Sequence, residues 1–187
     1  ELMTNPLKYT CLFGGGAIRG MAYIGTIRAL EELGIEYDII GGSSVGSVIA
    51  SLVACGYKSY ELENIFMKVN FDLFKDIHLG FGKAFALSKG EIFQDWLNEL
   101  LSKKVETVRG RNIYFEDLEK NLVIITTNLT KFSTQEFSKI VTPKFEIAQA
   151  IKISSSMPGL MAPYKYEDSF WSTVICRRHL LCGSYLT

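Results

Sequence analysis

Two short apolar runs near the start of the chain each end in small residues, and apolar residues at helical spacing follow each run. The first run, Tyr9–Phe13, leads into three glycines, and a helical pattern covers residues 21–33. The second run, residues 35–40, leads into two glycines and two serines, and a helical pattern resumes at Val45. This order predicts two parallel strands whose glycine-rich loops meet at the same carboxyl edge of a sheet.

The rest of the chain predicts further elements of an α/β domain. We expect helices over residues 45–55, 60–69, 90–101 and 145–151, strands over 122–129 and 134–140, and a turn or short helix over 114–118. Residues 71–87 are rich in aromatic and aliphatic side chains broken by glycines, which we interpret as core packing under an irregular connection. The alternative is a lipid-facing cap over the functional site, because exposed apolar patches mark interaction surfaces.

The composition fits a single globular domain without a metal site. The 187 residues are 48% hydrophobic and 21% charged, and 20 Lys and Arg balance 20 Asp and Glu without a basic block, which argues against a nucleic-acid surface. Four cysteines and two histidines have no metal-ligand spacing, so we expect no metal. We expect reduced thiols in a cytoplasmic protein, because the sequence shows neither a signal-peptide pattern nor an apolar run that could span a bilayer.

The residues between the second strand and its helix contain a candidate nucleophile. Gly42-Ser43-Ser44-Val45-Gly46 has the spacing Gly-x-Ser-x-Gly. A serine on a sharp strand-to-helix turn has a strained backbone, and flanking glycines remove the Cβ clashes that this turn would cause. The hydroxyl is then held at the top of the sheet, at a helix N-terminus that favours developing negative charge. The alternative is that Ser43 or Ser44 only caps the following helix.

The glycines after the first strand permit three interpretations. A dinucleotide site needs an acidic residue at the tip of the second strand, but Asp38 falls inside that strand. A phosphate-binding loop needs Gly-Lys-Ser/Thr after the glycines, and this sequence does not follow them. The third interpretation is an oxyanion hole, in which backbone N–H groups of the loop lie beside Ser44 at the shared sheet edge, as acyl transfer requires.

Together, the loop from Gly14 to Gly20, the helix after it and residues 42–46 resemble the patatin-like phospholipases. The resemblance implies a three-layer α/β/α domain with a mostly parallel central sheet, which hydrolyses acyl esters of lipids through a Ser–Asp dyad without histidine, metal or cofactor. It assigns the nucleophile to Ser44, the oxyanion loop to Gly14, Gly15 and Gly16 with Arg19 beside it, and the nucleophile elbow to Gly42 and Gly46. Ala17 departs from the family pattern, since many members have glycine there and alanine tolerates fewer backbone shapes.

The resemblance covers about residues 9–171 and stops one step before the catalytic base. Residues 154–163 resemble the Ser- and Pro-containing segment that precedes the family's catalytic aspartate, but no Asp-Gly pair follows from residue 164 onward. Asp168 lies upstream of the expected position, so we interpret it first as a turn residue and only second as a base. We therefore expect one C-terminally incomplete domain over residues 1–187, with a lead-in at 1–8 and a divergent tail at 172–187.

Two hypotheses about function follow. In the first, the chain is a serine acyl-ester hydrolase of phospholipase A type, in which Ser44 attacks the ester carbonyl of a lipid. In the second, it is a catalytically inactive lipid-binding relative, or a truncated fragment, that lacks the dyad aspartate. His78 is not required by the family mechanism. The partner in either case is a lipid or acyl ester, membrane contact is at most peripheral and transient, no cofactor is implied, and the sequence leaves the oligomeric state open.

Overall fold

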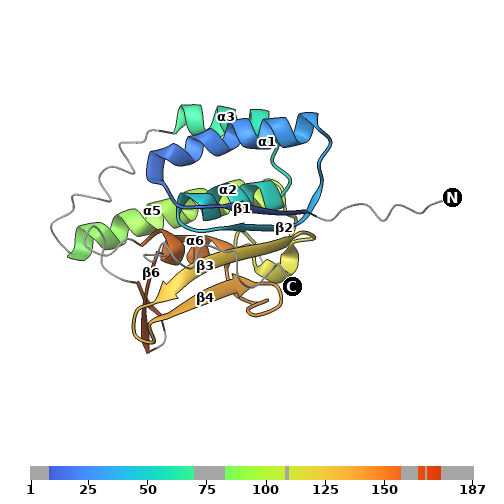
Figure 1. Cartoon of the computed structure of the whole chain (residues 1–187). Helices are drawn as coiled ribbons and strands as arrows, with labels where there is room; N and C mark the ends of the chain where they lie inside the picture. The colour runs from blue at the N-terminus through green and yellow to red at the C-terminus, as the bar shows by residue number, and fades with distance from the viewer. Residues whose placement is uncertain (1–8, 70–82, 108–109, 157–163, 167, 174–187) are drawn as a thin grey trace.

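A computed structural model describes residues 9–69, 83–107, 110–156, 164–166 and 168–173 of the chain (Figure 1). A mixed β-sheet runs through the described part. Its strands are β1 (Tyr9–Phe13), β2 (Tyr37–Gly42), β3 (Asn121–Asn128), β4 (Ser133–Ser138), β5 (Tyr164–Tyr166) and β6 (Ser169–Ser172).

The sheet is mixed, because β3 pairs in parallel with β2 and antiparallel with both β4 and β6. The strand order is β1-β2-β3-β6-β5, with β4 paired to β3 outside this path. β1, β2 and β3 are parallel, whereas β4 and β6 run antiparallel to β3, and β5 runs antiparallel to β6. The expectation of two parallel strands that end at one sheet edge is confirmed, since Phe13 at the end of β1 pairs with Gly42 at the end of β2.

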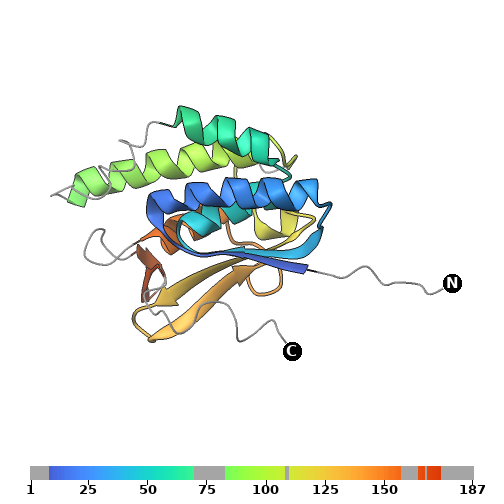
Figure 2. The same ribbon diagram turned by 45° about the horizontal axis from the view of Figure 1, so that its top comes forward.

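The described helices gather on one side of the sheet, as both ribbon views show (Figures 1 and 2). They are α1 (Ala22–Glu32), α2 (Val45–Ala54), α3 (Ser59–Lys68), α5 (Lys83–Ser102) and α6 (Ile147–Ser155), with the 3-10 turns η1 (Ala17–Met21) and η2 (Phe115–Asp117). α2 lies against β1, β2 and β3, and α6 lies against β3 and β6. The sequence predicts a helical layer on each face of the sheet. In the part of the chain that the structure describes, the helices form the layer on one face.

Helix α2 is the central element of the core. All its residues from Gly46 to Ala54 are buried, as expected for a helix without charged residues, and the hydroxyls of Ser47 and Ser51 are satisfied by backbone carbonyl oxygens. Ile49 and Leu52 are fully buried there, and they belong to the same hydrophobic cluster as Ile40 of β2 and Ile124 of β3. Because α2 is enclosed in this way, the start of the helix at Val45 is held firmly against the strand ends.

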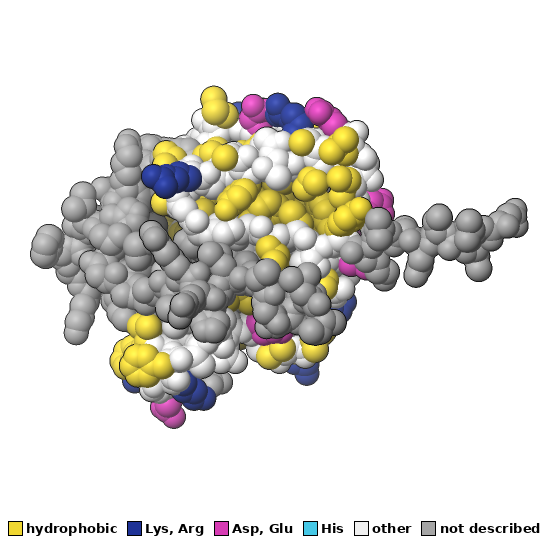
Figure 3. All heavy atoms as spheres, viewed as in Figure 1, with side chains coloured by type: hydrophobic (Ala, Val, Ile, Leu, Met, Phe, Trp, Pro, Cys, Tyr) yellow, Lys and Arg dark blue, Asp and Glu magenta, His cyan; other side chains and the backbone are white. Residues whose placement is uncertain are grey.

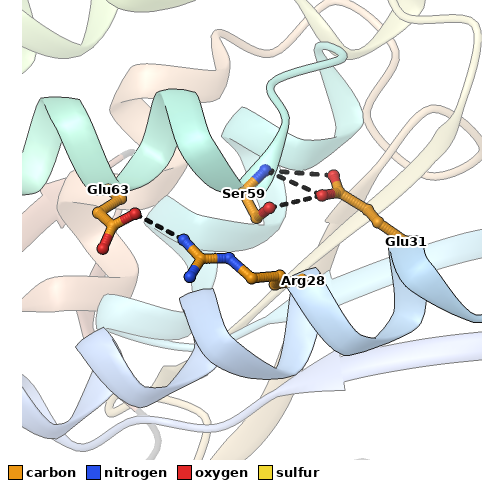
Figure 4. Close-up of polar contacts among 4 residues, drawn as sticks. All are labelled: Arg28, Glu31, Ser59 and Glu63. Carbon is orange, nitrogen blue, oxygen red and sulfur yellow. Dashed lines mark hydrogen bonds and ion pairs between the residues drawn. The ribbon is translucent and has the colours of Figure 1, made fainter.

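Two polar contacts fix α3 to α1 (Figure 4). The carboxylate of Glu31 accepts hydrogen bonds from the N–H of Ser59 at 3.1 and 3.3 Å and from its hydroxyl at 2.6 Å, at the first residue of α3. Closer to the middle of α1, Arg28 forms an exposed ion pair of 2.5 Å with Glu63.

The predicted elements are confirmed with shifted ends, and one segment was predicted wrongly. α5 begins at Lys83, so residues 83–87 are helical and do not belong to an irregular connection as expected. The helix continues through Gly90, because a single glycine disfavours a helix by only about 1 kcal/mol. The remainder of the proposed cap segment, residues 71–82 with His78, lies outside the described residues.

Candidate functional site

Ser44 occupies the turn between β2 and α2 in a strained backbone conformation. β2 ends at Gly42 and α2 begins at Val45, so Ser44 stands at the N-terminus of the helix. Its φ of 52° and ψ of −129° lie where residues with a side chain are seldom found. Its side chain makes no capping hydrogen bond to α2, which contradicts the interpretation of Ser44 as only a helix cap. Ser44 is also half-buried, whereas Ser43 is buried.

Gly42 and Gly46 stand at positions where a Cβ atom does not fit. A Cβ at Gly42 would overlap the backbone of Gly46, and a Cβ at Gly46 would overlap the carbonyl oxygen of Phe13. The N–H of Ser43 donates to that same carbonyl oxygen at 3.1 Å, which ties the turn to the end of β1. The two glycines therefore allow the turn to pass against β1, as the spacing of the motif predicts.

The glycine loop after β1 lies against Ser44. A Cβ added at Gly15 would stand 3.3 Å from the Cβ of Ser44, so the backbone of the loop and the candidate nucleophile are in contact. The hydroxyl of Tyr23 on α1 donates to the carbonyl oxygen of Gly14 at 3.1 Å and holds the start of the loop. The structure thus brings together the two motifs that the sequence separates by more than twenty residues.

Ala17 and Arg19 continue this loop in η1. Ala17 has a φ of 49°, the left-handed conformation that glycine adopts more easily, which is the backbone constraint expected at this departure from the family pattern. The N–H of Arg19 donates to the carbonyl oxygen of Gly16 at 3.0 Å, and its side chain is exposed. Arg19 therefore closes the 3-10 turn with its backbone, while its side chain faces solvent.

Ser154 is a site residue whose contact the sequence did not reveal. It lies near the end of α6 and is fully buried. Its hydroxyl oxygen accepts a hydrogen bond from the N–H of Ser44 at 3.0 Å and donates one to the carbonyl oxygen of Ile125 on β3 at 2.7 Å. The serine run that begins at residue 154 was visible in the sequence, but the contact joins residues 110 positions apart, and periodicity does not report such contacts.

Strand β6 points toward the turn that holds Ser44. β2 and β6 pair with the same edge of β3, and their registers separate Gly42 from Ser172 by three residues of β3, about 10 Å. Past the strand end, the N–H of Thr173 donates to the carbonyl oxygen of Ser156 at 2.6 Å, and the hydroxyl of Ser172 donates to the same oxygen at 2.7 Å. The end of β6 therefore carries two hydroxyl side chains beside the last turn of α6.

Asp168 lies at the other end of β6. It is exposed in the turn between β5 and β6 and precedes Ser169, the first residue of the strand. Trp171 pairs with Asn128, the last residue of β3, so Asp168 lies beyond the end of β3 and away from the elbow. The interpretation of Asp168 as a turn residue is confirmed.

The described cysteines do not compete with Ser44 as nucleophiles. Burial raises the pKa of the Cys55 thiol to about 12, so the thiol stays protonated and unreactive at neutral pH. Burial also raises the pKa of Cys11. Within the described ranges no cluster of His, Cys, Asp and Glu could hold a metal ion, and no helix there has the length and apolar character needed to cross a membrane.

A cavity of about 440 Å³ lies elsewhere, along α5 and the segment before η2. Its lining residues are Ile92, Asp95, Trp96, Asn98, Glu99, Arg111 and Asn112. None of these residues belongs to the elbow, the glycine loop or the end of β6. The cavity is therefore separate from the arrangement around Ser44.

Comparisons with known proteins show which family and which fold the chain resembles. The family model described as patatin-like phospholipase matches residues 12–175. The chain is 30% identical over 178 residues to the uncharacterized protein R571 of Acanthamoeba polyphaga mimivirus, covering 91% of this chain and 59% of that protein. It is 28% identical over 175 residues to the probable lipid hydrolase 463L of Invertebrate iridescent virus 6, covering 89% of this chain and 60% of that protein.

A solved structure shows the same fold. VipD from Legionella pneumophila matches with a TM-score of 0.67 at 18% identity, covering 90% of this chain and 46% of that chain. The chain thus spans about 60% of the length of the curated relatives it matches and under half of this structural neighbour.

Proposed function

Because the chain belongs to the patatin-like phospholipase family, we propose that it is a serine hydrolase that cleaves acyl esters of lipids with Ser44 as its nucleophile. The observation that carries the proposal is the strained turn at Ser44 with the glycine loop packed against it. A strained backbone at a half-buried serine is a feature of functional sites, because ordinary packing does not select it.

The proposed reaction is acyl transfer to water through the serine. The Oγ of Ser44 attacks the ester carbonyl carbon, its proton passes to a base, and the carbonyl oxygen becomes an oxyanion. Backbone N–H groups of Gly14, Gly15 and Gly16, together with the N-terminus of α2, stabilise that negative charge. The alkoxide then leaves with a proton, and water releases the acyl group from Ser44.

The mechanism also needs a general base that takes the proton of Ser44. The resemblance implies an aspartate that forms a dyad with Ser44, and β6 is the strand that leads to the elbow. Thr173 stands where β6 ends, and a hydroxyl does not serve as a general base at neutral pH. A positioned base contributes about 10²–10⁴-fold to such reactions, so its loss would leave only slow turnover by the oxyanion site.

This observation favours a second candidate function, an inactive relative that binds lipid without cleaving it. In that case, the elbow and the glycine loop form a site whose binding geometry is intact and whose proton acceptor is missing. The two candidates share the lipid partner and differ only in turnover.

We further propose that membrane contact, if the substrate is a bilayer lipid, occurs through the tip of the β3–β4 hairpin. Phe132 in this turn is 91% exposed with a φ of 50°, and Phe170 on β6 is 49% exposed. The N–H of Leu129 donates to the carbonyl oxygen of Phe170 at 2.8 Å, so the two aromatic residues share one tip. Lys131 and Lys165 are exposed beside them.

Hydrophobic side chains gather at the lower left of the space-filling view, where the hairpin tip lies, with basic and acidic side chains next to them (Figures 1 and 3). The tip lies at the carboxyl end of β3, the edge that also carries Ser44. Aromatic side chains next to lysines suit the interface of a bilayer with anionic lipids. A cytoplasmic location remains a prediction that the described free thiols of Cys11 and Cys55 support.

The test is hydrolysis of a short-chain nitrophenyl ester by the full chain and by Ser44→Ala, after circular dichroism has shown that both are folded. Turnover that disappears in Ser44→Ala supports the hydrolase. If the wild type is silent, Thr173→Asp supplies a carboxylate at the end of β6, and Thr173→Asn is its control without a base. Activity in the Asp variant alone would support the inactive relative with an intact site, whereas silence in all four proteins would contradict the assignment of Ser44.

A further inference from the structure

Ser154 connects three elements at the point where the backbone is strained. It belongs to α6, it accepts a hydrogen bond from the N–H of Ser44 in the elbow, and it donates one to Ile125 of β3. Both distances, 3.0 and 2.7 Å, are those of good hydrogen bonds. Because its proton is directed to Ile125, the lone pairs of Ser154 Oγ are oriented toward the elbow.

The neighbouring serines make intrahelical contacts instead. The hydroxyl of Ser156, the residue that follows α6, donates to the carbonyl oxygen of Lys152 in that helix, and the hydroxyl of Ser51 donates to the carbonyl oxygen of Ser47 in α2. Both side chains are buried like Ser154. A buried serine in or next to a helix therefore does not by itself form a hydrogen bond such as the one between Ser154 and Ser44.

We propose that Ser154 is a positioning residue that holds the nucleophile elbow in its reactive geometry. A backbone conformation such as that of Ser44 persists only where surrounding contacts fix it. The hydrogen bond that the N–H of Ser44 donates to Ser154 Oγ fixes the peptide before the nucleophile. The bond from Ser154 Oγ to Ile125 then ties this peptide to β3, the strand beside which β6 runs toward the site. This inference rests on the proposed function, since it concerns the reactivity of Ser44.

The bond also determines which groups stabilise the oxyanion. The N–H of Ser44 is engaged by Ser154 and does not point at a substrate. The donors are therefore left to the glycine loop and to the N–H groups at the start of α2. Loss of Ser154 would free the Ser44 amide and allow the elbow to relax from its φ of 52°.

The test compares Ser154→Ala with Ser154→Thr, which keeps the hydroxyl, and with Ser156→Ala as the matched control at the buried serine just after the same helix. Hydrogen exchange of the Ser44 amide, followed by NMR on serine-labelled full-length chain, should be about tenfold faster in Ser154→Ala, because one net hydrogen bond is lost. It should stay near the wild-type rate in Ser156→Ala. If Ser154→Ala does not fold, Ser154→Cys replaces it, since sulfur is a weak acceptor of similar volume.

The second readout is ester hydrolysis. We expect kcat to fall about tenfold in Ser154→Ala with KM within about twofold, and Ser154→Thr to restore most of kcat, because geometry at the nucleophile is lost and not substrate binding. If Ser154 only stabilised the fold, Ser154→Ala would lower the folded fraction, and the kcat of the folded enzyme would stay unchanged. Unchanged exchange at Ser44, or unchanged kcat in an active enzyme, would overturn the proposal. An inactive wild type would contradict the proposed function only, because the exchange rate of the Ser44 amide still shows whether Ser154 holds the elbow.

Discussion

The backbone conformation of Ser44 explains why glycine stands on both sides of it. At a turn with a φ of 52°, Gly46 lies so close to the end of β1, and Gly42 so close to the backbone of Gly46, that neither has room for a side chain. The sequence predicted these positions because the Gly-x-Ser-x-Gly spacing carries a mechanical reason for each glycine. The sequence also indicated constraint at Ala17, which the structure finds at a φ of 49°.

Alanine should therefore lower the stability of the protein at Gly46 and raise it at Gly25, a glycine of α1 with open space around it. Gly46→Ala places a Cβ into the carbonyl of Phe13 and should lower the free energy of unfolding by about 2 kcal/mol or more. Gly25→Ala in α1 meets nothing within 4 Å and should raise it by about 0.5–1 kcal/mol, since alanine is the better helix former.

Urea unfolding followed by circular dichroism measures both changes on the full chain. If Gly46→Ala is as stable as Gly25→Ala, the close approach of the elbow to β1 is wrong.

Among helices and strands, the periodic ones were predictable and the short ones were not. β3 and α2 are strongly apolar, and their predicted ranges agree with the structure to within one residue at each end. β5 and β6 have only 3 and 4 residues, too few for a period to appear, so the strand β6, whose end points toward the elbow, was missed. The link through Ser154 was missed for a related reason, because it depends on how α6 docks on β3 and not on either sequence alone.

The contact between α1 and α3 should depend on Glu31 more than on the nearby ion pair. Glu31 binds the backbone and hydroxyl of Ser59, which is 4% exposed, so Glu31→Ala removes a helix-capping interaction and should cost about 1–2 kcal/mol of stability. Arg28→Ala breaks an exposed ion pair with Glu63 and should cost at most about 1 kcal/mol.

Thermal or urea unfolding of the two single variants decides between them. A larger loss of stability in Arg28→Ala than in Glu31→Ala would contradict the greater role of Glu31. The same holds if added salt destabilises the wild type more than Glu31→Ala does, since the ion pair would then be the stronger contact between α1 and α3.

Taken as a unit, the described chain is an α/β domain in which three strand ends converge on one edge. The ends of β1 and β2 bring the glycine loop to Ser44, and the end of β6 approaches from the other direction. The hairpin tip with Phe132 and Phe170 lies on this same edge. An edge that combines a nucleophile with exposed aromatic residues suits a substrate drawn from a lipid surface.

Membrane binding should therefore depend on the tip. Phe132→Ser is expected to weaken co-sedimentation with vesicles of phosphatidylcholine and phosphatidylserine by roughly tenfold, since burying one aromatic side chain contributes about 1.5–3 kcal/mol. Leu33, which is 72% exposed at the end of α1, offers a control in Leu33→Ser away from the tip. Equal binding of both variants, or no binding by the wild type, would count against the tip as the contact surface.

We propose Ser44 as the nucleophile of an ester-cleaving site, and a covalent probe can test this role. The most direct measurement is peptide mass mapping after reaction of the folded full chain with a fluorophosphonate, which leaves a covalent adduct on an activated serine. One adduct per chain is expected, located by fragmentation on Ser44 and missing in Ser44→Ala, while Ser43 and Ser47 stay unmodified. An adduct on another residue, or a folded wild type without any adduct, would contradict it.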